Sequence, residues 1–295
     1  MDKPYIIVGM GEVLWDMLPE GRKIGGAPAN FAYHVSQFAL PSYVVSAVGR
    51  DMLGDEIMEN LRSKAINHLI ERTDSPTGTV MVEVDSAGIP RYDITEDVAW
   101  DHIPYTSEIE KIARRTVAVC FGSLAQRCAV SRDTIGRFLD AMPDTPDTLK
   151  VFDVNLRQDF YDKDVVENSL NRCNVLKIND EEIDLLGCMF GFQGISMQDK
   201  CWLLLGKYNL KILILTCGTR GSYVFTPGEM YFRPTPAVKV EDTVGAGDSF
   251  TASFISGILK GKTVPEAHRL AVETSAFVCS NKGAMPELPS SLTSL

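Results

Sequence analysis

The 295-residue sequence lacks the patterns that mark several common classes of protein. Its seven cysteines form no Cys-x-x-Cys pair and its four histidines form no His-Glu-x-x-His pattern, so we expect no dedicated zinc site. A Gly-x-Ser-x-Gly sequence is also missing, and with it the usual nucleophile of α/β-hydrolases. No run of about 18 apolar residues occurs, and the first residues show no signal-peptide pattern. We therefore expect a cytoplasmic protein with reduced cysteines and no membrane span.

Positive charge is also in short supply. The formal net charge is −10 and the isoelectric point is about 5.0, which argues against nucleic acid or an anionic membrane as a partner. If the substrate is anionic, a few locally placed cations must therefore bind it.

Two glycine-rich stretches resemble nucleotide motifs but fail on spacing. From Gly257 to Gly261 only three residues separate the glycines, whereas a P-loop requires four, so we interpret this stretch as the end of a helix. Gly9 and Gly11 follow the first apolar run, but Leu14 replaces the third glycine of a dinucleotide fingerprint. Neither stretch predicts a cofactor site.

Short β-branched runs alternate with longer segments of helical periodicity, which indicates an α/β fold with a mostly parallel sheet covered by helices. The predicted strands are Tyr5–Val8, Tyr43–Val48, Thr116–Phe121, Val151–Asp153, Val175–Ile178 and Ile212–Leu215. The predicted helices are Ala29–Phe38, Leu53–Lys64, Arg132–Met142, Lys200–Tyr208 and Pro265–Cys279.

One region departs from this alternation. Thr79–Val84 and Arg91–Thr95 predict a hairpin that turns at Ser86–Gly88, and its strands are too amphipathic for a buried parallel sheet. We expect a small outlying sheet that also includes segments within residues 13–24, and we interpret it as a lid.

The most informative stretch runs from Asp242 to Asp248 and continues into an apolar helical pattern. Gly245 and Gly247 flank Ala246 in a tight turn, and the first turn of a helix leaves N–H groups unpaired, so the turn is suited to binding an anion. Asp248 falls in that first turn. It is either a base beside an anion site or only a partner of the helix dipole.

A second glycine turn, Gly25-Gly26, leads into a helix that begins near Pro28. Asn30 on that helix can both donate and accept hydrogen bonds, as recognition of a neutral polyol requires. Alternatively, the glycine pair is only a tight turn and Asn30 only a surface residue.

Taken together, these stretches resemble the ribokinase-like, or PfkB, family of carbohydrate kinases over essentially the whole chain. The resemblance rests on Gly25-Gly26-x-x-x-Asn30, Val48-Gly49-Arg50-Asp51-x-x-Gly54 and Asp242-Thr243-x-Gly245-Ala246-Gly247-Asp248 in family order and spacing. Gly-Gly-Ala-Pro-Ala-Asn with Gly11-Glu12-x-x-x-Asp16 is most similar to the fructokinase branch. The resemblance implies one ribokinase-like, three-layer kinase domain over residues 1–295 with a small β-sheet lid.

The resemblance also implies roles for individual residues. Asp248 matches the catalytic base that accepts the proton of a sugar hydroxyl as that hydroxyl attacks the γ-phosphate of ATP. Gly245, Ala246 and Gly247 match the anion hole for the transferring phosphoryl group. The positions that match sugar contacts are Asp16, Gly26, Asn30 and Arg157, and Arg157 also lies near the transferring phosphate.

The nucleotide and cation positions follow in the same way. Asn179 and Glu182 match a pair that organises Mg²⁺ and phosphate, with Glu182 acting through water. Thr216, Gly218 and Gly221 match the nucleotide loop, which Gly245 and Gly247 complete. A monovalent cation such as K⁺ is implied at backbone groups of Asp242, Val244, Asn281 and Gly283.

The substrate is less sharply defined than the reaction. We expect a fructokinase, with 2-keto-3-deoxygluconate, ribose or nucleoside kinases and a non-catalytic sugar sensor as alternatives. Tyr92, Ile94 and Trp100 are candidates either for apolar or stacking contacts with the sugar or for simple lid packing. A homodimer through the lid is a further possibility, since an exposed edge hairpin needs cover.

Overall fold

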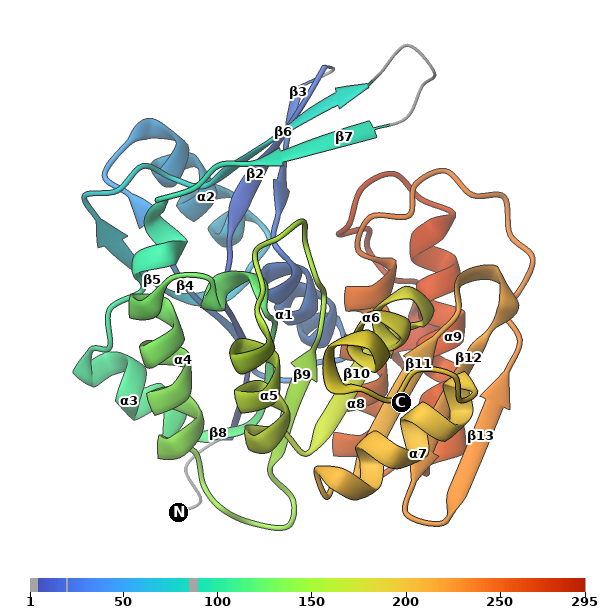
Figure 1. Ribbon diagram of the computed structural model, residues 1–295. Coiled ribbons are helices and arrows are strands. Elements are labelled where there is room, and N and C mark those ends of the chain that lie inside the picture. Colours follow the sequence, from blue (N-terminus) through green and yellow to red (C-terminus); the bar gives the residue numbers. More distant parts are fainter. Residues whose placement is uncertain (1–4, 20, 85–89, 295) are drawn as a thin grey trace.

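Two layers of helices enclose a large β-sheet, and a second, smaller sheet lies beyond one end of it (Figure 1). The computed structural model describes residues 5–19, 21–84 and 90–294, without the side chains of 82–84 and 90–92. Among the described residues, none of the helices combines the length and apolarity needed to cross a bilayer.

The described part of the large sheet has nine strands in the order β13-β12-β11-β10-β9-β8-β1-β4-β5. From β5 to β11 neighbouring strands pair in parallel, whereas β12 and β13 are antiparallel. The predicted mostly parallel α/β fold is confirmed. The strands are β1 (Ile6–Met10), β4 (Ser42–Gly49), β5 (Asn67–Thr73), β8 (Thr116–Phe121), β9 (Leu149–Asp153), β10 (Val175–Asn179), β11 (Ile212–Thr216), β12 (Ser222–Thr226) and β13 (Glu229–Arg233).

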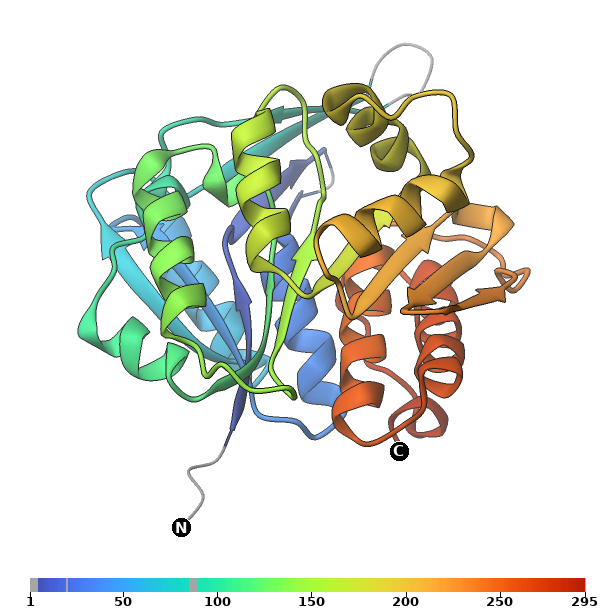
Figure 2. The same cartoon turned by 60° about the horizontal axis from the view of Figure 1, so that its bottom comes forward.

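Both faces of this sheet are buried, because successive side chains of a strand point to opposite faces. In β1, Ile6 and Val8 join the core under one helical layer and Ile7 joins the core under the other. One layer contains α3 (Ser107–Ala113), α4 (Ala129–Ala141), α5 (Lys163–Arg172), α6 (Asp180–Phe190) and α7 (Met197–Lys207). The other contains α1 (Ala27–Gln37), α2 (Met52–Ser63), α8 (Ala246–Leu259) and α9 (Val264–Cys279), with α1, α8 and α9 side by side in Figure 2; α10 (Ser290–Thr293) ends the described chain.

The predicted helices agree with α1, α2, α4, α7 and α9 to within three residues at each end. Residues 257–261 are a helix terminus as predicted, since α8 ends at Leu259 and Gly261 has a φ of +80°. The sequence prediction did not include α3, α5, α6, β5, β12 or β13.

The small sheet has the order β3-β2-β6-β7 and lies at the top of Figure 1. It consists of β2 (Leu14–Leu18), β3 (Gly21–Gly25), β6 (Thr79–Val84) and β7 (Pro90–Ile94), so the predicted small outlying sheet is confirmed. The predicted turn at Ser86–Gly88 lies outside the described residues. Trp15 of β2 packs with α1 and α2, which anchors one face of this sheet.

The Gly49-to-Gly54 motif fixes the segment that leads into β6. Asp51 caps α2 by accepting the Gly54 N–H at 2.8 Å, and it also accepts the N–H of Thr77 at 2.8 Å and its hydroxyl at 2.6 Å. A side chain on Gly54 would overlap the Gly49 carbonyl. This part of the family resemblance therefore has a structural explanation in the described contacts.

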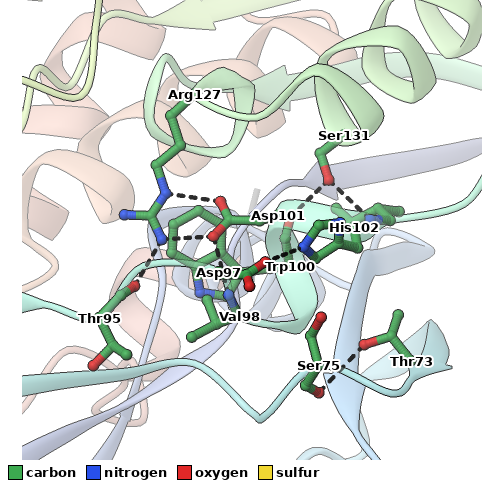
Figure 3. A network of polar contacts seen from close by, with 11 residues as sticks. Thr73, Ser75, Thr95, Asp97, Val98, Trp100, Asp101, His102, Arg127 and Ser131 are labelled. Carbon is green, nitrogen blue, oxygen red and sulfur yellow. Dashed lines mark hydrogen bonds and ion pairs between the residues drawn. The ribbon is translucent and has the colours of Figure 1, made fainter.

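A buried arginine holds the end of β7, beside the start of β6 (Figure 3). Arg127 follows the 3₁₀ helix η2 (Leu124–Gln126) and forms a bidentate pair with Asp101 of η1 (Ala99–His102), with both N–O distances 2.7 Å. Its guanidinium also donates to the carbonyl of Thr95 at 2.7 Å and lies between the rings of Trp100 and Phe160. Arg127 thus connects the end of β7 to the loop after β9.

These contacts decide whether Trp100 and Ile94 are available to contact a sugar or are used in packing. Trp100 is only 1% exposed and is covered by Arg127, and Ile94 is buried in the same core, so packing explains both. Sugar stacking by Trp100 is wrong for this conformation, because the ring has no free face. The side chain of Tyr92 is outside the described part of the chain.

Candidate functional site

The predicted site residues gather at one edge of the large sheet, because the carboxyl ends of parallel strands meet there. Among these residues, Arg157 follows β9, Asn179 ends β10 and Thr216 ends β11. The contact between Asn30 and Asp248 brings the starts of α1 and α8 together.

Asp248 lies in the first turn of α8, as the sequence predicts. Gly245 is the N-cap of this helix and has a φ of +78°, and a side chain there would overlap Ala284. The side-chain amide of Asn30 donates from Nδ2 to Oδ2 of Asp248 at 2.8 Å, and its Oδ1 is buried without a partner among the described residues. Asn30 is thus buried, at 3% exposure, and the alternative of a helix-surface residue is wrong.

The carboxyl group of Asp248 is tuned by burial and by its neighbours. Its pKa is raised to about 6, mainly by burial and also by the charge of Asp153, while Asn30, Lys177 and Arg157 act in the opposite direction. An aspartate with this pKa is mostly ionised at neutral pH and can accept a proton from a substrate.

The glycine pair before α1 allows two acidic residues to approach the backbone closely. A side chain on Gly25 would overlap the carboxylate of Asp16, and one on Gly26, which has a φ of +110°, would overlap the carbonyl of Glu12. Burial raises the pKa of Asp16 to about 6, opposed by Lys23 on the paired strand β3. The glycines are therefore required by close packing at the acidic side of the site.

Glu12 was part of the resemblance, but the sequence assigned it no role. It is 3% exposed, and burial raises its pKa to about 7, with Asp248 raising and Arg157 lowering it. The signal was an acidic residue immediately after the first buried strand.

Arg157 is on the exposed loop after β9. Among the described contacts, its guanidinium makes one hydrogen bond: Nη1 donates to the carbonyl of Leu156 at 3.1 Å. Its charge lowers the pKa of both Asp248 and Glu12, so it is oriented within electrostatic range of the acidic groups. Glu182 supports this loop: its carboxylate accepts the N–H groups of Leu156 at 3.0 Å and of Asn179 at 2.9 Å.

The expected nucleotide loop follows β11. Thr216 is half-buried, and Gly218 begins the 3₁₀ helix η3 (Gly218–Arg220) with a φ of +54° and open space where a side chain would be. Arg220 pairs with Asp180, and the hydroxyl of Thr235 donates to the Gly218 carbonyl. Gly221 has a different explanation, since a side chain there would overlap the carbonyl of Arg233 on β13.

The four residues expected at a monovalent cation are brought together. Asp242 accepts the N–H of Val244 and the N–H of Gly283, both at 3.0 Å, so the loop before α8 lies against the segment after α9 that contains Asn281. Within the described chain no cluster of three or more His, Cys, Asp or Glu side chains is arranged to hold a metal ion. Backbone carbonyls, rather than such a cluster, are the donors available here.

A buried ion pair, which was not predicted from the sequence, lies beside the first turn of α8. Lys177 of β10 and Asp153 of β9 are register partners, and the ammonium lies 3.0 Å from the carboxylate. The available signal was a lysine inside the otherwise apolar run of Val175 to Ile178.

Comparisons with known proteins agree with this architecture. Residues 20–291 match the model of the pfkB family carbohydrate kinases. An ATP-dependent 6-phosphofructokinase of Thermoanaerobacterium thermosaccharolyticum is 28% identical, with 98% of this chain and 92% of the relative covered. A fructokinase of Klebsiella pneumoniae is 27% identical, with 95% of each chain covered.

The solved structures agree on the fold. The structure of a fructokinase with bound ATP from Xylella fastidiosa superposes with a TM-score of 0.85 at 20% identity, covering 99% of this chain and 98% of that one. The resemblance drawn from the three sequence motifs is thereby confirmed. The chain belongs to the pfkB family of carbohydrate kinases.

Proposed function

We propose that this sugar kinase transfers the γ-phosphate of ATP to a hydroxyl group of fructose. The observation that carries the proposal is the hydrogen bond between Asn30 and Asp248 at the N-terminus of α8. It supports the proposal because it joins a carboxylate and a polar amide next to the glycine turn before α8, and phosphoryl transfer needs a base, a group that holds the sugar and an anion site. Fructose is supported by the likeness to fructokinases.

In the proposed reaction Asp16, Gly26, Asn30 and Arg157 hold the sugar. Asp248 accepts the proton of the attacking hydroxyl, the new bond forms between the sugar oxygen and the γ-phosphorus, and the bond to the β-phosphate oxygen breaks to release ADP. The N–H groups of Gly245, Ala246 and Gly247 stabilise the charge on the transferring phosphoryl group. Arg157 supplies a cation that the acidic chain otherwise has in short supply.

ATP is assigned to Asn179, Thr216, Gly218 and Gly221, together with Gly245 and Gly247. The open space at Gly218 supports close approach of a ligand there, whereas Gly221 acts by shaping the loop. Mg²⁺, when bound with ATP, would neutralise phosphate charge. Glu182 would support it only through water, because its carboxylate already accepts two backbone N–H groups. K⁺ is assigned to backbone groups of Asp242, Val244, Asn281 and Gly283.

The small sheet is assigned the role of a lid within a single kinase domain over residues 1–295. Asp16 on β2 is the group through which a bound sugar would hold this lid. The exposed side of the sheet, where Met81 is 46% exposed, is assigned as the surface for a homodimer.

An ADP-release screen tests the substrate. The acceptors are fructose, glucose, ribose, 2-keto-3-deoxygluconate and adenosine, each with ATP and Mg²⁺, with and without K⁺. Fructose 6-phosphate is added because a 28% identical relative is a 6-phosphofructokinase. We expect the highest kcat/KM with fructose; a higher value with another acceptor overturns the assignment of the sugar. ADP release with none of them, despite ligand-induced thermal shifts, supports the non-catalytic sensor.

The change Asp248→Asn tests the base. The variant should bind sugar and ATP but lose about 10²- to 10⁴-fold in kcat, because a positioned general base contributes that much. Asp133→Asn, at an exposed position on α4, is the matched control and should retain kcat. A kcat within about threefold of the wild type would assign the proton transfer to another group.

A further inference from the structure

A lysine and an aspartate are buried directly beneath the first turn of α8. Side chains of Lys177 and Asp153 are 9% and 6% exposed, and both come from central parallel strands. Burying two charges costs several kcal/mol even when they pair, and a well-packed apolar pair would often be as stable. The pair is therefore weak evidence for stability and calls for another explanation.

The ammonium group of Lys177 lies against the backbone of the proposed anion hole. A Cβ atom on Gly247 would be 3.1 Å from the Lys177 Nζ and would meet no other group so closely. A hydrogen in place of a side chain thus lets a fixed positive charge approach the turn from below. This charge adds to the field of the helix N-terminus, which favours anions.

Asp153 connects the same lysine to α8. The hydroxyl of Thr251 donates to the Gly247 carbonyl at 3.0 Å and lies 3.4 Å from the second carboxylate oxygen of Asp153. Asp153 therefore holds Lys177 on one side and the first turns of α8 on the other. Without it, the flexible lysine could pair with the acidic groups nearby.

Asp248 is the group on which both charges act. The charged groups that face it are Asp153 from β9, Lys177 from β10, Arg157 from the loop after β9 and Glu12 from the loop after β1. Cys120 of β8 is also near, and burial, then Asp153 and Asp248, raise its pKa, so it is neutral. Asp153 raises the pKa of Asp248 and Lys177 lowers it.

We propose that Lys177 and Asp153 are positioning residues for phosphoryl transfer, with Lys177 supplying a fixed positive charge under Gly247 and Asp153 holding that charge away from Asp248. This inference rests on the proposed function of the same site. Lys177 acts through the backbone of the anion hole and Asp153 acts through Lys177 and α8.

The test compares Lys177→Met and Asp153→Asn with a matched control. Lys200→Met is that control. Lys200 is also buried, pairs with Asp184 at 2.6 Å and lies 3.2 Å from where a Cβ on Gly187 would be, but it lies on helix α7 and its partners lie on helix α6. Both site variants should lower kcat by at least about tenfold, with KM for the sugar changed less than about threefold. The control should retain kcat.

The pH profile distinguishes positioning from a structural role. The acidic limb of kcat/KM should move to higher pH in Lys177→Met and to lower pH in Asp153→Asn, since the two charges act on Asp248 in opposite directions. It should stay in place in Lys200→Met. If the acidic limb of kcat/KM does not move in the two site variants, or moves in the same direction in both, the inference is overturned.

Two further measurements cover failure of a variant or of the reaction. If Lys177→Met does not fold, the double variant Lys177→Met/Asp153→Asn, which leaves no unpaired buried charge, should fold and still have a low kcat. A wild-type kcat in the double variant overturns the inference.

Titration of the Asp248 carboxyl group by carbon-13 NMR needs no substrate. If the wild type phosphorylates no acceptor, the proposed function fails, while opposite shifts of the Asp248 titration still support the positioning and an unmoved titration overturns it.

Discussion

At the scale of single residues, Asp248 combines a proposed catalytic role with an unfavourable environment. Its pKa is raised from 3.8 to about 6, so the folded state holds this proton more tightly than the unfolded chain does. Folding is therefore penalised above pH 6 and relieved as the pH falls through 6. A base in this position reduces stability in the pH range in which it works.

This penalty predicts a stability gain when the charge is removed. Asp248→Asn should unfold with a free energy higher by up to about 3 kcal/mol at pH 8, since about two pKa units correspond to that energy, and the gain should shrink toward pH 5. Urea unfolding at both pH values measures it, with Asp133→Asn as the exposed control. The same change in stability at both pH values would show that the charge of Asp248 is not the cause.

Removal of the Arg157 side chain is expected to lower activity without changing stability, because its described hydrogen bond reaches only the neighbouring Leu156 carbonyl. Arg157→Ala should lower kcat/KM by about 100-fold while the free energy of unfolding changes by less than about 0.5 kcal/mol. Steady-state kinetics measures kcat/KM and urea unfolding measures the free energy of unfolding, with Arg62→Ala on the surface of α2 as the control. A sharp loss of stability with normal turnover per folded molecule would make Arg157 a structural residue.

At the scale of elements, the local sequence predicted individual helices and strands well, but it did not predict which side chains of different elements pair. The strand and helix patterns and the turn before α8 are encoded within a few neighbouring residues, so β1, α1 and the position of Asp248 could be predicted. The pairs Lys177–Asp153 and Arg127–Asp101 could not, because they depend on strand register and on segments 24 and 26 residues apart. Trp100 was ambiguous for the same reason: its cover, Arg127, belongs to another element.

The buried pair between Arg127, which follows η2, and Asp101 of η1 is expected to contribute strongly to the stability of the fold. Arg127→Met should lower the free energy of unfolding by about 3–5 kcal/mol, because it leaves the fully buried carboxylate of Asp101 without its cation. Arg114→Met, which breaks the exposed pair with Glu110 on α3, should change it by less than about 1 kcal/mol. Similar effects of the two changes on urea unfolding would contradict the role of the buried pair.

At the scale of the whole molecule, the parallel sheet places groups from distant parts of the chain at one edge. Because each strand ends there, residues from the first 30 positions, from the middle of the chain and from the start of α8 form one site. The small sheet extends over this region from the other side in Figure 1, and Asp16 on β2 belongs to it. A sugar that contacts both Asp16 and Asp248 would therefore join the small sheet to the large one.

This arrangement predicts where a sugar stabilises the protein. Saturating fructose should slow amide hydrogen exchange in β2 and β6 and at the start of α8, because the ligand ties these elements together, and should leave β12 and β13 unchanged. Mass spectrometry of the exchanged protein, with a non-binding polyol such as sorbitol as the control, measures the effect. Asp248→Asn should retain the protection and Asp16→Ala should lose it in β2, since only the second change removes the contact on the small sheet. Protection confined to β11–β13 would place the sugar elsewhere and would separate the small sheet from acceptor binding.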